Sequence, residues 1–212
     1  MTSTTPARAE RDALCDLFLE VGPDVPTLCE GWTARDLAAH LVVRERRPDI
    51  APGMVISALA GHSEHVRVAE TERPWPELVE RVRTGPPVWN PMRIGKVEEL
   101  VNTVEFFVHH EDVRRAQDGW TRRALSPDLE DALAAPLRRM GGVLTRRAGV
   151  GLVAEPAGRS AVRLRRGEPA VTIRGPVGEL VLYVYGRKDV AAVELDGPAD
   201  AVARVGAASF GF

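Results

Sequence analysis

The chain has few of the residues from which proteins build cysteine-based frameworks. It is 212 residues long and contains two cysteines, Cys15 and Cys29. Two cysteines are too few for a disulfide framework, and these two lack the spacing of a zinc knuckle. We therefore interpret both as reduced thiols, and we expect any bound metal to be held by histidine and carboxylate side chains.

The sequence also lacks a long apolar run and a strong excess of charge. No stretch of about eighteen apolar residues is present, and residues 1–12 lack the basic start and apolar block of a secretory signal. The net charge is -2 and the pI is near 6.2, which gives no electrostatic footprint for nucleic acid or an anionic membrane. We expect a cytoplasmic globular protein whose partners include no nucleic acid and no membrane.

The apolar residues that are present predict a helical first part. Leu14, Leu17, Phe18 and Val21 are spaced as on one buried face of a helix. Further helices are expected over 33–47, about 53–70, 75–85, 97–118 and 126–147. For the second of these, Thr33 followed by Asp36 resembles a capping box.

After Gly149 the pattern changes to short β-type runs separated by glycine and proline. Strands are predicted over 151–156, 161–167, 169–175 and 190–197, and helices over 176–187 and 198–207. The order is strand, strand, strand, helix, strand, helix. We therefore predict an α+β protein with a metal-binding helical bundle in residues 1–149 and a small α+β domain in residues 150–212.

The predicted helix 97–118 places a carboxylate on an apolar face. Val104, Glu105, Val108 and His109 share this face, with Glu105 and His109 one turn apart. An uncompensated carboxylate inside a bundle would cost several kcal/mol, on the order of the penalty for any buried unpaired charge. An arginine from a neighbouring helix, protonation of Glu105, or a divalent cation shared by Glu105 and His109 would each compensate it.

A second ligand-type residue is expected to face the same core. His40 is flanked by Leu37 and Leu41 on the inward face of the predicted helix 33–47. Two histidines and one glutamate make the ligand set of a catalytic zinc site whose fourth position is left for water or substrate. Nickel or iron would suit the same ligands.

Both segments resemble a known family. The stretches "CEGWTARDLAAHL" (29–41) and "ELVNTVEFFVHHEDVRRAQ" (99–117) are similar to the two signature segments of the mycothiol-dependent maleylpyruvate isomerase family, part of the DinB-like metal-binding superfamily. The first carries the pattern W-T-x-x-D-L-x-x-H-L and the second the pattern E-x-x-x-H-H-x-D. The resemblance extends over the whole chain, because family members carry a small α+β C-terminal domain.

This resemblance implies a fold, a cofactor and a chemistry. It implies a DinB-like four-helix bundle that binds zinc, or another divalent metal, through His40, Glu105 and His109. It also implies mycothiol as the thiol cosubstrate, bound to the metal as thiolate, in cis-trans isomerisation of a small organic acid or in thiol transfer. The alternative is a non-catalytic protein in which the metal is structural.

Two further residues are candidate catalytic residues. Asp112, near His109 on the same face, is expected to orient the imidazole, and the alternative is a surface ion pair with Arg115. Arg187 matches a carboxylate-binding arginine of the family by its Gly-Arg context, and the alternative is a charge that complements a helix end. His110, one position around the helix, is interpreted as a residue at the edge of the bundle.

Overall fold

A computed structural model describes residues 4–47, 60–87, 90 and 95–211. The chain forms two compact units, Met1–Arg122 and Arg123–Phe212, and each is described by itself.

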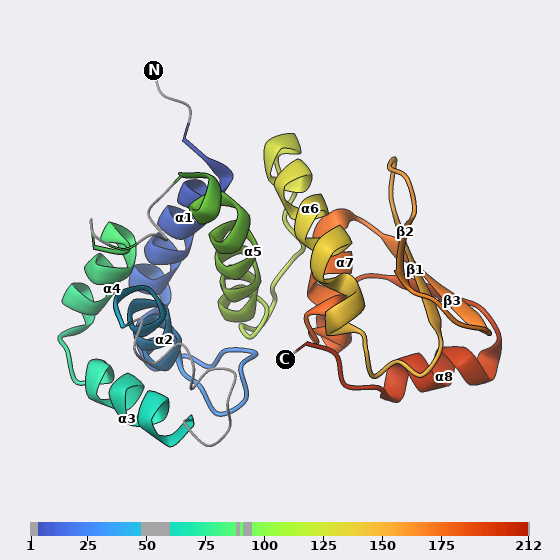
Figure 1. Ribbon diagram of the computed structural model, residues 1–212. Helices are drawn as coiled ribbons and strands as arrows, with labels where there is room; N and C mark the ends of the chain where they lie inside the picture. The colour runs from blue at the N-terminus through green and yellow to red at the C-terminus, as the bar shows by residue number, and fades with distance from the viewer. Residues whose placement is uncertain (1–3, 48–59, 88–89, 91–94, 212) are drawn as a thin grey trace. The chain divides into compact units, whose positions relative to one another are not determined.

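The first unit is helical in its described residues (Figure 1). Its helices are α1 (Pro6–Val21), α2 (Ala34–Arg46), α3 (Ala60–Thr71), α4 (Trp75–Thr84) and α5 (Gly95–Arg114). These match the five predicted segments, although the predicted start of the third helix, near residue 53, lies outside the described residues. None of the helices in the described part of the chain is long and apolar enough to cross a membrane.

Local sequence signals set the helix ends. The hydroxyl of Thr33 accepts a hydrogen bond from the Asp36 backbone N–H, and the Asp36 carboxylate accepts one from the Thr33 backbone N–H, so the predicted capping box is confirmed. Helix α1 ends at Gly22, whose φ of 85° favours glycine. Helix α5 ends at Arg114, which is four residues earlier than the sequence pattern predicted.

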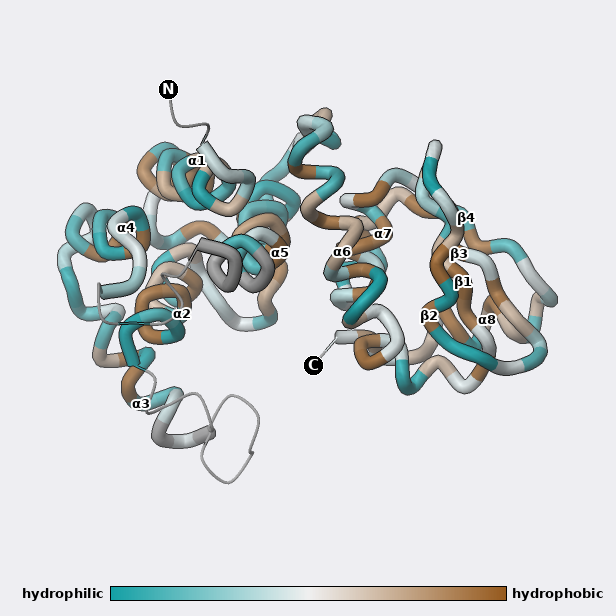
Figure 2. The backbone as a smooth tube through the Cα atoms, turned by 45° about the horizontal axis from the view of Figure 1, so that its top comes forward, coloured by the Kyte–Doolittle hydropathy of each residue, from teal (hydrophilic) through white to brown (hydrophobic). Residues whose placement is uncertain are grey.

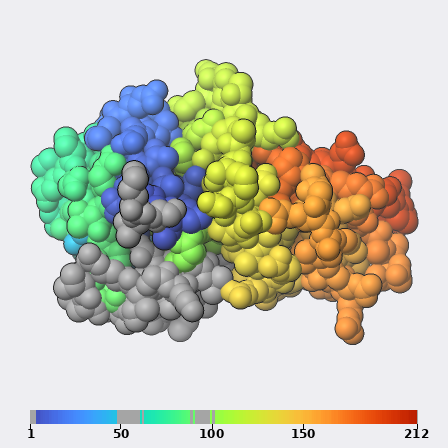
Figure 3. Space-filling view, turned by 90° about the horizontal axis from the view of Figure 1, so that it is seen from above, coloured from blue at the N-terminus to red at the C-terminus, as the bar shows by residue number. Residues whose placement is uncertain are grey.

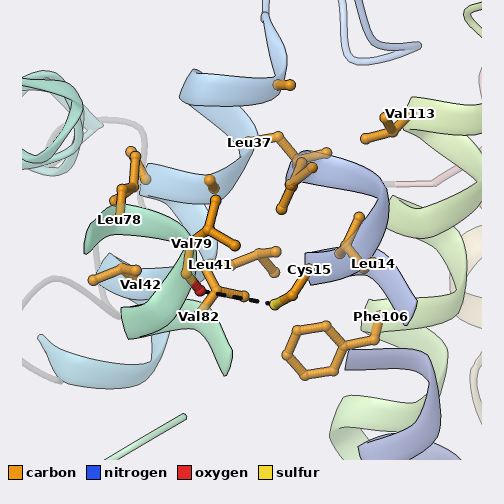
Figure 4. Packing of buried hydrophobic residues seen from close by; sticks show 14 residues of the cluster. Leu14, Cys15, Leu37, Leu41, Val42, Leu78, Val79, Val82, Phe106 and Val113 are labelled. Atoms are coloured by element: carbon orange, nitrogen blue, oxygen red, sulfur yellow. Dashed lines mark hydrogen bonds between the residues drawn. The ribbon is translucent and has the colours of Figure 1, made fainter. Parts of the chain in front are cut away.

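The core of the first unit is formed by α1, α2, α4 and α5 (Figure 4). Leu14 and Phe18 of α1 are fully buried, as the apolar spacing predicted. Cys15 also lies in this core, where its thiol is 3.8 Å from the carbonyl oxygen of Val79. This apolar contact surface fixes the positions of α2 and α5, the two helices that carry the candidate ligands.

A buried ion pair crosses the same core. Arg11 of α1 and Glu45 of α2 are each about 1% exposed, and the Nη1 atom of Arg11 lies 2.8 Å from Oε2 of Glu45. The same nitrogen donates to the Val82 carbonyl at 2.7 Å, and the guanidinium lies 4.1 Å from the Phe106 ring centroid. Both charges are therefore paired inside the protein, as burial of a charge requires.

We expect Glu45→Gln to lower the free energy of unfolding by about 3–5 kcal/mol, because it leaves the Arg11 guanidinium buried without its counter-charge. The matched control is Glu77→Gln, since Glu77 is 51% exposed and pairs with Arg73 on the surface, and it should change stability by less than about 1 kcal/mol. Urea unfolding followed by circular dichroism measures both. Equal effects of the two substitutions would contradict the prediction.

The second unit combines helices with a four-stranded sheet (Figure 1). Its elements are α6 (Pro127–Leu144), β1 (Gly151–Pro156), β2 (Val162–Arg165), β3 (Ala170–Gly175), α7 (Val177–Val184), the 3-10 helix η4 (Lys188–Val190), β4 (Glu194–Asp196) and α8 (Ala199–Ala207). The predicted order of strands and helices after Gly149 is confirmed.

The sheet is mixed, with strand order β2-β1-β3-β4. Strands β1 and β3 are parallel neighbours, while β2 and β4 are antiparallel to β1 and β3 respectively. The two central strands carry most of the apolar residues of the sheet, seen as brown segments in Figure 2, and their Leu152 and Ile173 are fully buried. Helix α7 is buried along its whole length, and its one charged residue, Glu179, accepts a hydrogen bond from the Ala192 backbone N–H at 2.8 Å.

The boundary between the units differs from the one expected near residue 150. Helix α6 packs on α7 and β2, so it belongs to the second unit, and its atoms (yellow in Figure 3) lie against those of the sheet (orange). Gly141 and Gly142 allow this close approach, because a Cβ atom at Gly142 would lie 2.7 Å from the carbonyl oxygen of Leu164. The apolar periodicity of α6 predicted a buried face but not the elements against which that face packs.

Candidate metal centre

His40, Glu105 and His109 converge at one point of the first unit. The Oε1 atom of Glu105 lies 3.4 Å from Nε2 of His40 and 3.3 Å from Nε2 of His109. One ligand atom from each residue falls within 4.8 Å of the other two. The structure therefore brings together the three side chains that the sequence predicted as metal ligands.

Two helices position these side chains. Glu105 and His109 are one turn apart on α5, and their neighbours Val104 and Val108 are buried, so this face turns inward as predicted. His40 follows the capped start of α2 by two turns. The three side chains are 12–22% exposed, so the cluster is partly open to solvent.

Arg44 completes the surroundings of Glu105. It lies one turn after His40 on α2, and its Nε atom is 3.2 Å from the same Oε1 of Glu105. Its Nη1 atom donates to Oδ1 of Asn102 at 2.9 Å. The sequence analysis allowed for an arginine that compensates Glu105 but did not name it. Arg44 could have been named, because it shares the inward face of its helix with His40.

The other side of the His109 ring faces Asp112. The Nδ1 atom of His109 is 2.9 Å from Oδ2 of Asp112, and Asp112 is fully buried. Arg115, the alternative partner considered for Asp112, donates from Nε to Glu111 at 2.6 Å. The geometry thus places Asp112 where it can hold the orientation of the His109 imidazole.

Cys29 lies beside the same pair, and sequence reasoning did not place it there. Its Sγ atom is 3.3 Å from Oδ2 of Asp112 and 4.0 Å from Nδ1 of His109. The loop that carries it is fixed to α5 because the Leu28 backbone N–H donates to the Asp112 carbonyl at 3.0 Å. No periodic pattern exists in a loop, so only the position of Cys29 at the start of the "CEGWT" segment pointed to this location.

The contacts within the cluster shift its protonation. Burial raises the pKa of Glu105, but the Arg44 guanidinium and hydrogen bonds from His109 and His40 outweigh burial and hold this pKa well below its usual range. Burial lowers the pKa of His40, and its hydrogen bond to Glu105 offsets this only in part.

His109 shifts in the opposite direction. Burial lowers its pKa, but hydrogen bonds to Asp112, Cys29 and Glu105 raise the pKa well above the usual value for histidine. In the absence of a metal, these shifts favour an ionised Glu105, a protonated His109 and a neutral His40. Two carboxylates flanking one imidazole are the physical cause of its preference for the proton.

The remaining predicted residues lie elsewhere. His110 is buried, with Nδ1 3.1 Å from Oε2 of Glu10, so the interpretation of His110 as a residue at the edge of the bundle was wrong. Arg187 follows α7 in the second unit, where its Nη1 donates to the Tyr185 carbonyl at 2.7 Å. Its predicted contact with a substrate carboxylate stays a prediction.

Comparison with known proteins relates the chain to solved structures. No family model matches the chain, and no curated protein sequence matches it. The crystal structure of the mycothiol-dependent maleylpyruvate isomerase matches with a TM-score of 0.57 and 15% identity, covering 90% of each chain. A variant of that enzyme with one histidine replaced by alanine matches with a TM-score of 0.56 and the same identity and coverage. The chain therefore shares the fold of these structures.

We expect Arg44→Met to destabilise the metal-free protein by about 1–3 kcal/mol, because Glu105 loses its ion-pair partner at 3.2 Å while staying ionised. The double variant Arg44→Met/Glu105→Gln should recover part of this loss, since both charges are then removed. Urea unfolding in the presence of a chelator measures the four proteins of the cycle. Strictly additive effects would show that the two side chains are not coupled.

Proposed function

We propose that this protein is a zinc-dependent enzyme that uses mycothiol, a low-molecular-weight thiol, in cis-trans isomerisation of a small organic acid or in thiol transfer. His40, Glu105 and His109 are the proposed metal ligands. The proposal places the enzyme in the cytoplasm, where cysteines such as Cys29 stay reduced.

The distances from the Glu105 ligand atom to the two imidazole nitrogens fit a tetrahedral metal. Ligand atoms that lie about 2.0–2.1 Å from a tetrahedral zinc ion are about 3.3 Å from one another. Oε1 of Glu105 is 3.4 Å and 3.3 Å from the Nε2 atoms of His40 and His109. In the metal-free protein both nitrogens hydrogen-bond to this oxygen, and the same two distances fit a shared metal, so the ligand atoms would need to move little to bind it.

The partial exposure of the cluster supports a catalytic rather than a structural metal. Structural zinc sites are closed by four protein ligands, whereas catalytic sites keep one position for water or substrate. Three ligands that are each 12–22% exposed fit the second description. A bound zinc ion would supply the charge that keeps a thiol deprotonated at neutral pH.

Asp112 and Arg44, which contact the proposed ligands, would hold those ligands in position. Asp112 accepts a hydrogen bond from Nδ1 of His109, which leaves Nε2 available as the ligand atom. Arg44 holds the Glu105 carboxylate in place through Oε1. The similar fold of the mycothiol-dependent maleylpyruvate isomerase supports the choice of thiol and reaction class.

Elemental analysis of the purified protein tests the ligand set. Because the Cys29 thiol next to His109 offers zinc another ligand, the test is made in the Cys29→Ser background. We expect about one zinc ion per chain in Cys29→Ser and a loss of most of it in Cys29→Ser/His40→Ala, because two ligands bind zinc much more weakly than three. His65→Ala is the control, since His65 is exposed on α3 and should leave the zinc content unchanged. Equal zinc content in Cys29→Ser and Cys29→Ser/His40→Ala would refute the ligand assignment.

Retention of labelled mycothiol tests the thiol. We expect the zinc-loaded wild type to retain it in equilibrium dialysis, and Glu105→Gln to lose it, because a neutral amide is a poor zinc ligand. The surface variant Glu77→Gln should retain mycothiol like the wild type. If Glu105→Gln retains it equally, the thiol does not depend on this metal centre.

A further inference from the structure

We propose that Cys29, His109 and Asp112 form a second cation site, which takes a thiophilic divalent ion and competes with the first site for His109. The observation behind it is that both ring nitrogens of His109 face ligand-type atoms. Nε2 faces Glu105 at 3.3 Å, and Nδ1 faces Asp112 at 2.9 Å and the Cys29 thiol at 4.0 Å.

The spacing of the three atoms suits a metal. Sulfur, nitrogen and oxygen atoms bonded to a tetrahedral zinc ion at about 2.0–2.3 Å lie about 3.3–3.6 Å apart. The distances here are 3.3 Å from Sγ of Cys29 to Oδ2 of Asp112, 2.9 Å from Asp112 to Nδ1 of His109, and 4.0 Å from Cys29 to that nitrogen. These values bracket the required spacing, so small side-chain rotations would complete the site.

The backbone holds the cysteine in this position. The bond from the Leu28 N–H to the Asp112 carbonyl fixes the loop to α5, and the Thr27 hydroxyl accepts from the Cys29 backbone N–H at 3.2 Å. Asp112 is fully buried, while Cys29 is partly exposed. An ion from solvent would therefore reach the sulfur first, and a soft thiolate favours zinc or cadmium over magnesium or calcium.

Only one of the two sites can hold a metal at a time, because a neutral His109 can bind a metal through only one of its ring nitrogens. A neutral imidazole carries one N–H, so a metal on Nε2 leaves the proton on Nδ1, where Asp112 accepts it. A metal on Nδ1 would instead leave the proton on Nε2, where Glu105 accepts it. Filling the second site thus removes a ligand from the first. This competition rests on the proposed function, whereas the second site itself does not.

The other cysteine provides an internal control. Cys15 is fully buried in the core, and burial raises the pKa of its thiol to about 12. Its sulfur lies beside the Val79 carbonyl and takes no part in either cluster. A metal–thiolate bond in this protein therefore reports on Cys29.

Titration with cadmium tests the site through the ultraviolet charge-transfer absorption of a cadmium–thiolate bond. We expect this absorption in the wild type, in Cys15→Ala and in His40→Ala, because none of these changes removes a ligand of the second site. Cys29→Ser should abolish it. Absence of the band in the wild type and His40→Ala, or its survival in Cys29→Ser, would overturn the proposal.

Zinc release measures the competition between the sites. Cadmium added to the zinc-loaded wild type should release one zinc ion for each cadmium–thiolate bond formed, and the release should fall at least tenfold in Cys29→Ser. A full thiolate band with zinc retained would show that the sites are independent. Failure of the proposed function has a separate result, namely zinc content in Cys29→Ser/His40→Ala equal to that in Cys29→Ser, with the cadmium band of the wild type intact.

Discussion

The carboxylate of Glu105 is the constraint around which the first unit is organised. It lies on a helix face whose neighbours are buried valines, and it keeps its negative charge there because three nitrogen atoms surround one of its oxygens. One belongs to a permanent cation, Arg44, and two belong to imidazoles whose protonation can change. The cluster therefore stays neutralised without a metal while still presenting metal-binding atoms.

This arrangement reaches the core of the unit through a chain of polar contacts. Arg44 is held by Asn102, whose amide nitrogen lies 3.4 Å from Glu45, and Glu45 pairs with Arg11 of α1. These contacts connect the cluster to an ion pair that crosses the core. Such networks resist rearrangement, because moving one member leaves the next one unsatisfied in a low-dielectric environment.

The sequence was a good guide wherever periodicity or capping governs the structure. The apolar faces of α5 and α2 predicted that Glu105, His109 and His40 would face one core, and the family resemblance added the expectation that the three share a metal. The packing of α6 in the second unit could not be predicted, because an apolar helix face does not identify the element against which it packs. Here two glycines of α6 allow the close approach of β2. The position of Cys29 depends on a loop held by backbone hydrogen bonds, which leave no pattern in the side chains. The early end of α5 at Arg114 was missed because nothing in the apolar pattern marks that turn.

One of those backbone hydrogen bonds bears on how freely this region can change during evolution. The loop is attached to α5 through the amide of residue 28 and the carbonyl of residue 112, and neither group belongs to a side chain. Any residue except proline supplies the same amide at position 28. Substitutions at position 28 would therefore keep the thiol at position 29 in the same place beside α5. The contacts of His109 can then be retained even where the side chains of this loop differ.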